Sequence, residues 1–172
     1  MPEGPEIRRA ADKVAAVLVG KNIEEVGFGL ERLKRFEKRL SGHTVTAVDT
    51  RGKAMLTRFD NHLTIYSHNQ LYGRWYTVRR PRMPKTNRQL RVELCTETHK
   101  ALLYSASDIA VLDDKGLSAH PFLIRVGPDI LDRKLSASQI VERLQAPEFR
   151  NRALGSLYLD QAFLAEIGRA HV

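Results

Sequence analysis

Apolar positions near the start of the chain recur at three- and four-residue spacing, with charged residues mostly between them. The positions are Ile7, Ala11, Val14 and Leu18. This period places apolar side chains on one face of an α-helix, and Pro5 is tolerated in a first helical turn. The pattern therefore predicts an amphipathic helix that begins near Pro5 and ends at Gly20.

From about Asn22 to Ser107 the apolar period changes to two. In LRVELC, the apolar residues Leu90, Val92 and Leu94 alternate with Arg91, Glu93 and Cys95. Alternation of this kind is typical of antiparallel strands that pack one face on a core. Residues 60–61 and the long basic stretch 79–88 are predicted hairpin connections. The alternation alone would fit a sandwich or a barrel.

A helical pattern returns in the last third of the chain, after Gly127 and Pro128. Ser136 and Gln139 have the spacing of a capping box, which predicts a helix that stops before Pro147. A second helical run begins near Leu154 and continues toward residue 165. We place a boundary near residue 130, between a strand-rich domain (1–130) and the start of a helical domain (131–165).

The charge balance points to a polyanionic partner. The chain of 172 residues is 42% hydrophobic and 28% charged and has a formal net charge of +8. Its cations are spread along the whole length, which suits nucleic acid. No apolar stretch approaches the length of a membrane span, and the single cysteine, Cys95, allows no intramolecular disulfide. These features exclude a membrane or secreted protein and predict an intracellular one.

The opening hexapeptide MPEGPE is unusual because it suits neither a helix nor a strand. Removal of Met1 would leave Pro2 with a free secondary amine, which can attack an aldehyde-like carbon and form an iminium. Glu3 beside it could donate or shuttle the proton that such a reaction requires. From these two residues alone, a small residue after Met1 and an acid before a helix are the simpler interpretation.

Several segments, taken in order, resemble the bacterial formamidopyrimidine-DNA glycosylase and endonuclease VIII family, and most closely its endonuclease VIII branch. They are MPEGPEIRRAAD, TRGKAMLTRF, LTIYSHNQLYGRW, LLYSASDI, HPFLIRVGPDIL and FRNRALGSLYLDQAFLA. The resemblance runs from Met1 to about Ala165. It implies an α+β chain: an N-terminal helix plus a two-sheet antiparallel β-sandwich, followed by the start of a helical (helix-two-turn-helix) domain.

The resemblance also implies catalytic roles for three residues. Pro2 matches the nucleophile that attacks the anomeric carbon of a damaged nucleotide, and Glu3 matches the acid. Lys53, in TRGKAML, matches a proton donor on a β-hairpin. Without the resemblance, Lys53 would be interpreted as a solvated turn residue after Gly52.

Further residues match DNA contacts of the family. A nucleotide that is turned out of a duplex leaves a hole, and Gln70, Leu71 and Tyr72 match the residues that fill it. A Leu-Tyr pair at a strand end would otherwise suggest core packing. Arg125 matches an arginine that contacts DNA, whereas the plain alternative is a surface arginine near a turn. The five cations in 79–88 fit DNA contact by charge and a solvated loop equally well.

The pattern departs from the family at the end of the chain. Glu166 stands where a glycine is expected, and Arg169 where a DNA-binding asparagine is expected. The family's four-cysteine zinc finger has no counterpart, so we expect no cofactor in this chain, whereas an intact relative would carry structural zinc. The final heptapeptide EIGRAHV matches the in-frame translation of a common sequencing adapter. We therefore expect residues 166–172 to be an artefactual tail on a truncated protein.

The implied function is that of a bifunctional DNA glycosylase and abasic-site lyase. It would remove oxidised pyrimidines from damaged double-stranded DNA through a Schiff base and cleave the strand by β,δ-elimination, with this truncated chain impaired. The alternatives are the oxidised-purine specificity of the same family and a non-catalytic DNA-binding remnant. We expect a monomer in the bacterial cytoplasm, associated with the nucleoid and not with a membrane.

Overall fold

The computed structural model describes residues 3–167. Its strands form two four-stranded antiparallel sheets, with strand orders β1-β6-β7-β5 and β2-β3-β4-β8. The first sheet contains β1 (Glu25–Phe28), β5 (Arg74–Arg79), β6 (Leu90–Cys95) and β7 (His99–Tyr104). The second contains β2 (Val45–Arg51), β3 (Ala54–Phe59), β4 (Thr64–His68) and β8 (Asp108–Leu112). Two sheets with an N-terminal helix confirm the predicted α+β class.

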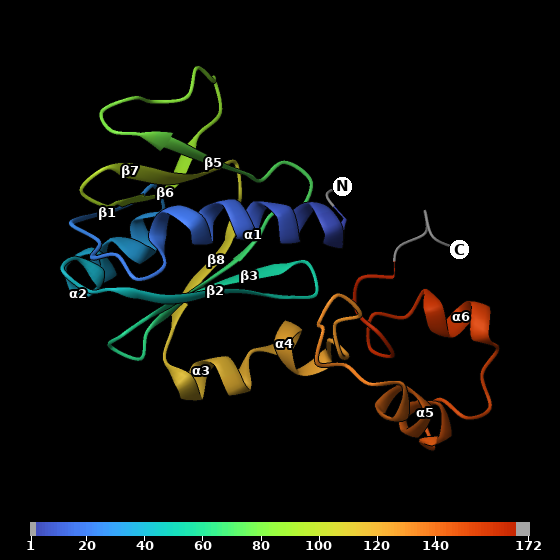
Figure 1. Cartoon of the computed structure of the whole chain (residues 1–172). Coiled ribbons are helices and arrows are strands. Elements are labelled where there is room, and N and C mark those ends of the chain that lie inside the picture. Colours follow the sequence, from blue (N-terminus) through green and yellow to red (C-terminus); the bar gives the residue numbers. More distant parts are fainter. Residues whose placement is uncertain (1–2, 168–172) are drawn as a thin grey trace.

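The predicted N-terminal helix is α1 (Gly4–Leu18), which lies along the sandwich and packs on both sheets (Figure 1). The apolar face that the sequence indicated is buried, and Ala11, Val14 and Leu18 join one core cluster with strands of both sheets. The helix ends two residues before the predicted Gly20, which has a φ of 75° and lies just beyond the C-cap Val19. Glycine reaches this left-handed region at little cost.

The prediction of strands throughout 22–107 is wrong for one segment. Residues 31–40 form a short 3-10 helix, η1 (Glu31–Phe36), and a single-turn helix, α2 (Glu37–Leu40). Here the apolar period is three to four, because Leu33 and Leu40 are buried and Phe36 packs against the core. The strands also extend beyond 107, since β8 ends at residue 112.

Two short helices that the periodicity did not predict cover the outer face of the second sheet. They are α3 (Asp114–Ala119), capped by the Asp113 side chain, and α4 (Pro121–Arg125), which lies inside the HPFLIR segment. Leu123 of α4 joins Leu56 and Tyr66 of the sheet in a second hydrophobic cluster. This contact fixes α4 beside one end of the sandwich.

The C-terminal part forms a small cluster of its own around Phe149, Leu157 and Phe163. Helix α5 (Ala137–Gln145) begins with the predicted capping box, in which Ser136 N donates to Gln139 Oε1 at 2.9 Å. Helix α6 (Leu154–Tyr158) is shorter than predicted. It ends at Tyr158, and beyond it the Asp160 side chain accepts from Ala162 N at 2.9 Å in a turn that stands where the sequence predicted a continuing helix.

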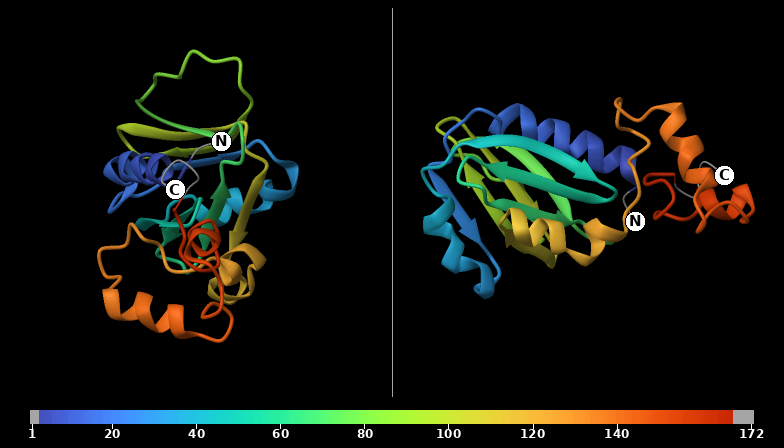
Figure 2. Two further views of the ribbon diagram at one scale, coloured as in Figure 1. Left: turned by 90° about the vertical axis from the view of Figure 1, so that its right-hand side faces the viewer. Right: turned by 90° about the horizontal axis from the view of Figure 1, so that it is seen from below.

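The chain then returns to the sandwich. Ala165 N donates to Pro128 O at 2.9 Å, and Ile130 N donates to Ala165 O at 3.2 Å. These bonds bring the segment before residue 167 beside the end of the sandwich where α1 begins (Figure 2). Among the described helices, none is long and apolar enough to cross a membrane. Cys95 is fully buried in β6, and burial raises the pKa of its thiol to about 11.

Candidate active site at one end of the sandwich

Glu3 and Lys53 meet as an ion pair, with Lys53 Nζ 2.9 Å from Glu3 Oε2. Glu3 is the N-cap residue of α1, and its backbone N–H donates to Glu6 Oε2 at 3.1 Å. The Lys53 side chain is only 17% exposed. Pro2 lies outside the described residues, but it is bonded directly to Glu3. Two of the three predicted catalytic residues are therefore brought together at the start of α1.

Lys53 is positioned by a tight hairpin between β2 and β3. Gly52 has a φ of 55°, the left-handed value that a two-residue hairpin loop of this kind requires at its first position. A Cβ at Gly52 would lie 2.8 Å from Val126 Cγ2, so the hairpin tip packs tightly against the chain just after α4. This close approach explains why a glycine precedes the lysine.

A second carboxyl group, that of Glu166, reaches the same site. It is 4% exposed, its two carboxylate oxygens have no hydrogen-bond partner among the described residues, and it occupies the space where a Cβ on Gly4 would stand. Burial, and after it the charge of Asp129, raise the pKa of Glu166 to about 7, while Lys53 opposes the shift. Sequence reasoning missed this contribution to the site.

The backbone at Glu166 has a φ of 76°, in the region that favours glycine. The glycine that the resemblance expects at this position would adopt that conformation freely and would leave the space over Gly4 empty. The sequence therefore contained one signal for this feature: a glutamate stands at position 166, where the resemblance expects a glycine.

Gln70, Leu71 and Tyr72 form an exposed turn between β4 and β5, which we call the wedge turn (residues 70–72). Leu71 is 59% exposed and Tyr72 is 69% exposed, so the core-packing alternative is wrong for both. The register pairs His68, at the end of β4, with Ala54, the residue after Lys53. The wedge turn thus follows a strand end that adjoins the Glu3–Lys53 pair.

His68 links these two parts of the site. Its Nδ1 accepts the Gln70 backbone N–H at 3.0 Å, which requires that nitrogen to be unprotonated. Burial lowers the pKa of His68, and Lys53 lowers it further, against an opposing effect of Asp108. The neutral ring is therefore favoured at neutral pH, and it holds the first residue of the wedge turn.

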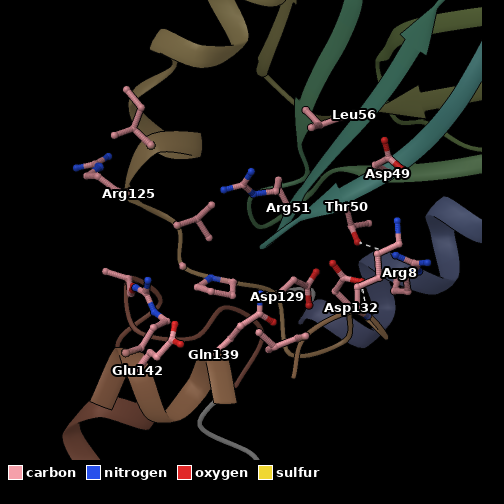
Figure 3. Close-up of a pocket in the computed structure, with 18 of the residues that line it drawn as sticks. Arg8, Asp49, Thr50, Arg51, Leu56, Arg125, Asp129, Asp132, Gln139 and Glu142 are labelled. Carbon is pink, nitrogen blue, oxygen red and sulfur yellow. Dashed lines mark hydrogen bonds between the residues drawn. The ribbon is translucent and has the colours of Figure 1, made fainter. Parts of the chain in front are cut away.

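Arg125 ends α4 and is exposed, with its Nε donating to Pro121 O at 3.2 Å. It lines a cavity of about 1080 Å³ between the β2–β3 hairpin, the segment after α4, and α5 (Figure 3). Arg8 and Arg51 line the same cavity, together with Asp129 and other polar residues. Arg125 thus lies at the same end of the sandwich as the Glu3–Lys53 pair, but it takes no part in that pair.

Metal ligands are not gathered in the part of the chain that the structure describes. Within residues 3–167, no group of three or more histidine, cysteine, aspartate or glutamate side chains could hold a metal ion. The residues present therefore do not fit the structural zinc that the resemblance implies for an intact relative. Arg169 lies outside the described residues.

Comparison with known proteins gives the family. The sequence pattern described as the formamidopyrimidine-DNA glycosylase N-terminal domain matches residues 1–108. The chain belongs to this family. Among curated relatives, Endonuclease 8 of Salmonella agona is 54% identical over 168 residues, and Endonuclease 8 of Escherichia coli O1:K1 / APEC is 55% identical. In both cases the match covers 98% of this chain and 64% of the relative, so the chain spans about two thirds of the length of these relatives.

Solved structures of the family share the fold. A complex of Lactococcus lactis Fpg with DNA that contains an abasic site matches with a TM-score of 0.74 at 15% identity, covering 97% of this chain and 63% of that one. MutM bound to DNA with carbocyclic 8-oxo-G matches with a TM-score of 0.73 at 14% identity, covering 97% and 64%. The sandwich and the segments after it are therefore the fold of the N-terminal part of such proteins.

Proposed function

We propose that this chain carries the catalytic part of a bifunctional DNA glycosylase and abasic-site lyase of base-excision repair, with oxidised pyrimidines in double-stranded DNA as its substrates. The observation that carries the proposal is the 2.9 Å ion pair between Lys53 and Glu3, the residue that follows Pro2 in the sequence. Membership of the family supports it, as does the name Endonuclease 8 of relatives that are more than half identical.

The chemistry begins at the amine of Pro2. Its lone pair attacks C1′ of the damaged nucleotide, the glycosidic bond breaks, and the base leaves with a proton supplied by an acid. Glu3 and Lys53 are the proton-carrying groups at this place. The attack first gives a closed N-glycoside, and opening of the sugar ring at the C1′–O4′ bond, with a proton passing to O4′, then gives the iminium between the Pro2 nitrogen and C1′. The iminium makes the neighbouring C2′–H acidic, and removal of that proton by a base expels the 3′ phosphate in a β-elimination. A second, δ-elimination would release the 5′ phosphate. No step of this chemistry passes through zinc.

DNA contacts are assigned to the exposed groups near this pair. Leu71 and Tyr72 are exposed enough to enter the hole left by an extruded nucleotide, and Gln70 offers a polar group to the orphaned base. Arg125 offers an exposed guanidinium to a phosphate. The net charge of +8 favours association with DNA and predicts a steep salt dependence. Since the relatives come from bacteria, we place a monomeric protein in the bacterial cytoplasm.

The test is borohydride trapping on an oligonucleotide with a single abasic site. The chain with Met1 removed should form a covalent adduct, whereas the Pro2→Gly variant and a form that retains Met1 should form much less. A folded chain that binds DNA but yields no adduct would favour the non-catalytic alternative. A panel of duplexes with oxidised pyrimidines or oxidised purines then tests the substrate class, and faster excision of purines would contradict the proposal.

A further inference from the structure

The wedge turn is exposed, yet its backbone is held at both ends. Asn69 is 7% exposed, and its carbonyl accepts the Gly73 N–H at 2.7 Å. A Cβ at Gly73 would lie 2.5 Å from Asn69 O and 2.6 Å from Asn69 Cα. The backbone at Gly73 therefore approaches Asn69 so closely that a residue with a side chain would clash there. The base of the turn is therefore a narrow loop with little freedom.

The first residue of the turn is fixed by two contacts. Gln70 has a φ of 52°, and its N–H donates to His68 Nδ1 at 3.0 Å. Ser107 Oγ donates to Gln70 Oε1 at 2.9 Å. Ser107 is itself held, because Arg32 Nη2 donates to its carbonyl at 3.0 Å. These contacts fix the start of the turn, whereas the Tyr72 carbonyl, near its other end, is held by a different contact.

Arg88 supplies that support from the basic segment 79–88. Its Nη1 donates to the Tyr72 carbonyl at 2.5 Å. Arg80, in the same segment, is instead paired with Glu24 at 2.8 Å and Glu25 at 2.7 Å. The two arginines of this segment therefore have different partners: Arg80 pairs with carboxylates, whereas the Arg88 guanidinium donates to the backbone of the wedge turn.

We propose that Arg88 is a positioning residue, which holds the Tyr72 carbonyl so that the Leu71 and Tyr72 side chains project from the turn already arranged for insertion into a duplex. This inference rests on the proposed function of the same site. A charge-assisted hydrogen bond to a backbone carbonyl leaves the side chains free while it removes disorder from the turn. Binding then costs less conformational entropy, which favours the inserted state.

The structure offers a matched control. Arg82 carries the same charge in the same segment, is exposed, and makes no side-chain hydrogen bond or ion pair with any described residue. The Arg82→Gln and Arg88→Gln variants lose the same charge, but only the second loses the contact with Tyr72. Arg88→Lys keeps the charge and the ability to donate a hydrogen bond, so it should retain part of the function.

Two measurements on the full chain test the proposal. Hydrogen–deuterium exchange of the free protein should show the Gln70 and Gly73 amides exchanging about tenfold faster or more in Arg88→Gln, and unchanged in Arg82→Gln, because only Arg88→Gln removes a charge-assisted hydrogen bond to the turn. Base excision from a lesion duplex should show a kcat reduced about tenfold in Arg88→Gln but not in Arg82→Gln, with similar KM values in the two variants.

Adduct formation on a single-stranded abasic oligonucleotide separates this proposal from the proposed function. A single strand has no hole to fill, so Arg88→Gln should form adduct as fast as the unaltered chain. Unchanged amide exchange, or equal losses in the two glutamine variants, would overturn the role of Arg88. A loss in Arg88→Gln on the single strand as large as that on the duplex would also overturn it. No adduct from the unaltered chain would count against the proposed function, whereas amide exchange would still decide whether Arg88 holds the turn.

Discussion

Lys53 Nζ lies 2.9 Å from Glu3 Oε2, although one residue ends a hairpin loop and the other begins a helix. The pair is partly exposed, so its contribution to the free energy of unfolding is small, about 0–1 kcal/mol. The pair fixes a carboxylate and an ammonium group at the start of α1, and Glu3 directly follows Pro2 in the sequence. Substitutions here should therefore change chemistry more than stability.

Replacing Glu3 with glutamine keeps the size of the side chain but removes its acid. We expect base excision to fall about 10²–10⁴-fold, because the departing base loses a proton donor. Adduct formation at a preformed abasic site should persist, since no base remains to be expelled. Single-turnover excision and borohydride trapping measure the two steps. Glu31→Gln, an exposed change on η1, is the control, and equal losses in both steps would instead place Glu3 in the attack by Pro2.

Gly52→Ala should lower the free energy of unfolding by about 1–3 kcal/mol. The new Cβ would meet Val126, and a non-glycine residue is strained at this positive φ. Urea denaturation measures the change. Gly155→Ala in α6 is the matched control, since nothing lies within 4 Å of its Cβ position, and it should be neutral or stabilising. An equal cost in both variants would contradict the tight packing of the hairpin tip.

Alanine at Leu71 or Tyr72 should separate stability from activity. Both side chains are exposed, so the free energy of unfolding should change by less than about 0.5 kcal/mol. The rate of excision from a duplex should fall about tenfold or more. An aromatic ring stacked on a base contributes about 1–3 kcal/mol to binding, and this contribution would be lost. A clear loss of thermal stability in either alanine variant would instead indicate that the side chain packs against the rest of the fold.

Glu166→Gln should remove a pH dependence of stability. The pKa of Glu166 is raised from 4.5 to about 7 in the folded chain, so its stabilising contribution is complete below pH 4.5 and is lost as the pH rises through 7. Relative to the glutamine variant, the unaltered chain should lose about 3 kcal/mol over this window. Thermal melts from pH 4.5 to 8 measure it, with Glu142→Gln, an exposed change in α5, as the control. Parallel pH profiles for the unaltered chain and Glu166→Gln would contradict the buried position of Glu166.

Local patterns predicted several elements well, because their signals are carried by neighbouring residues. The three- and four-residue spacing marked α1, and the Ser136–Gln139 capping box marked the start of α5. The same rule would have found η1 and α2 from Leu33, Phe36 and Leu40, but the alternating segments around them obscured it. Helix α4 is too short for its period to show, and its packing on Leu56 and Tyr66 makes it stable.

By itself, the sequence determined the helix faces, the alternation of the strands, the basic charge and, through its motifs, the family. The tertiary structure decided which distant groups meet: Lys53 with Glu3, Arg88 with the Tyr72 carbonyl, and the Glu166 carboxyl with the space over Gly4. The physical reason is that periodicity reports which side of an element is buried, whereas a contact between elements depends on sheet register, turn geometry and the path of the chain between them.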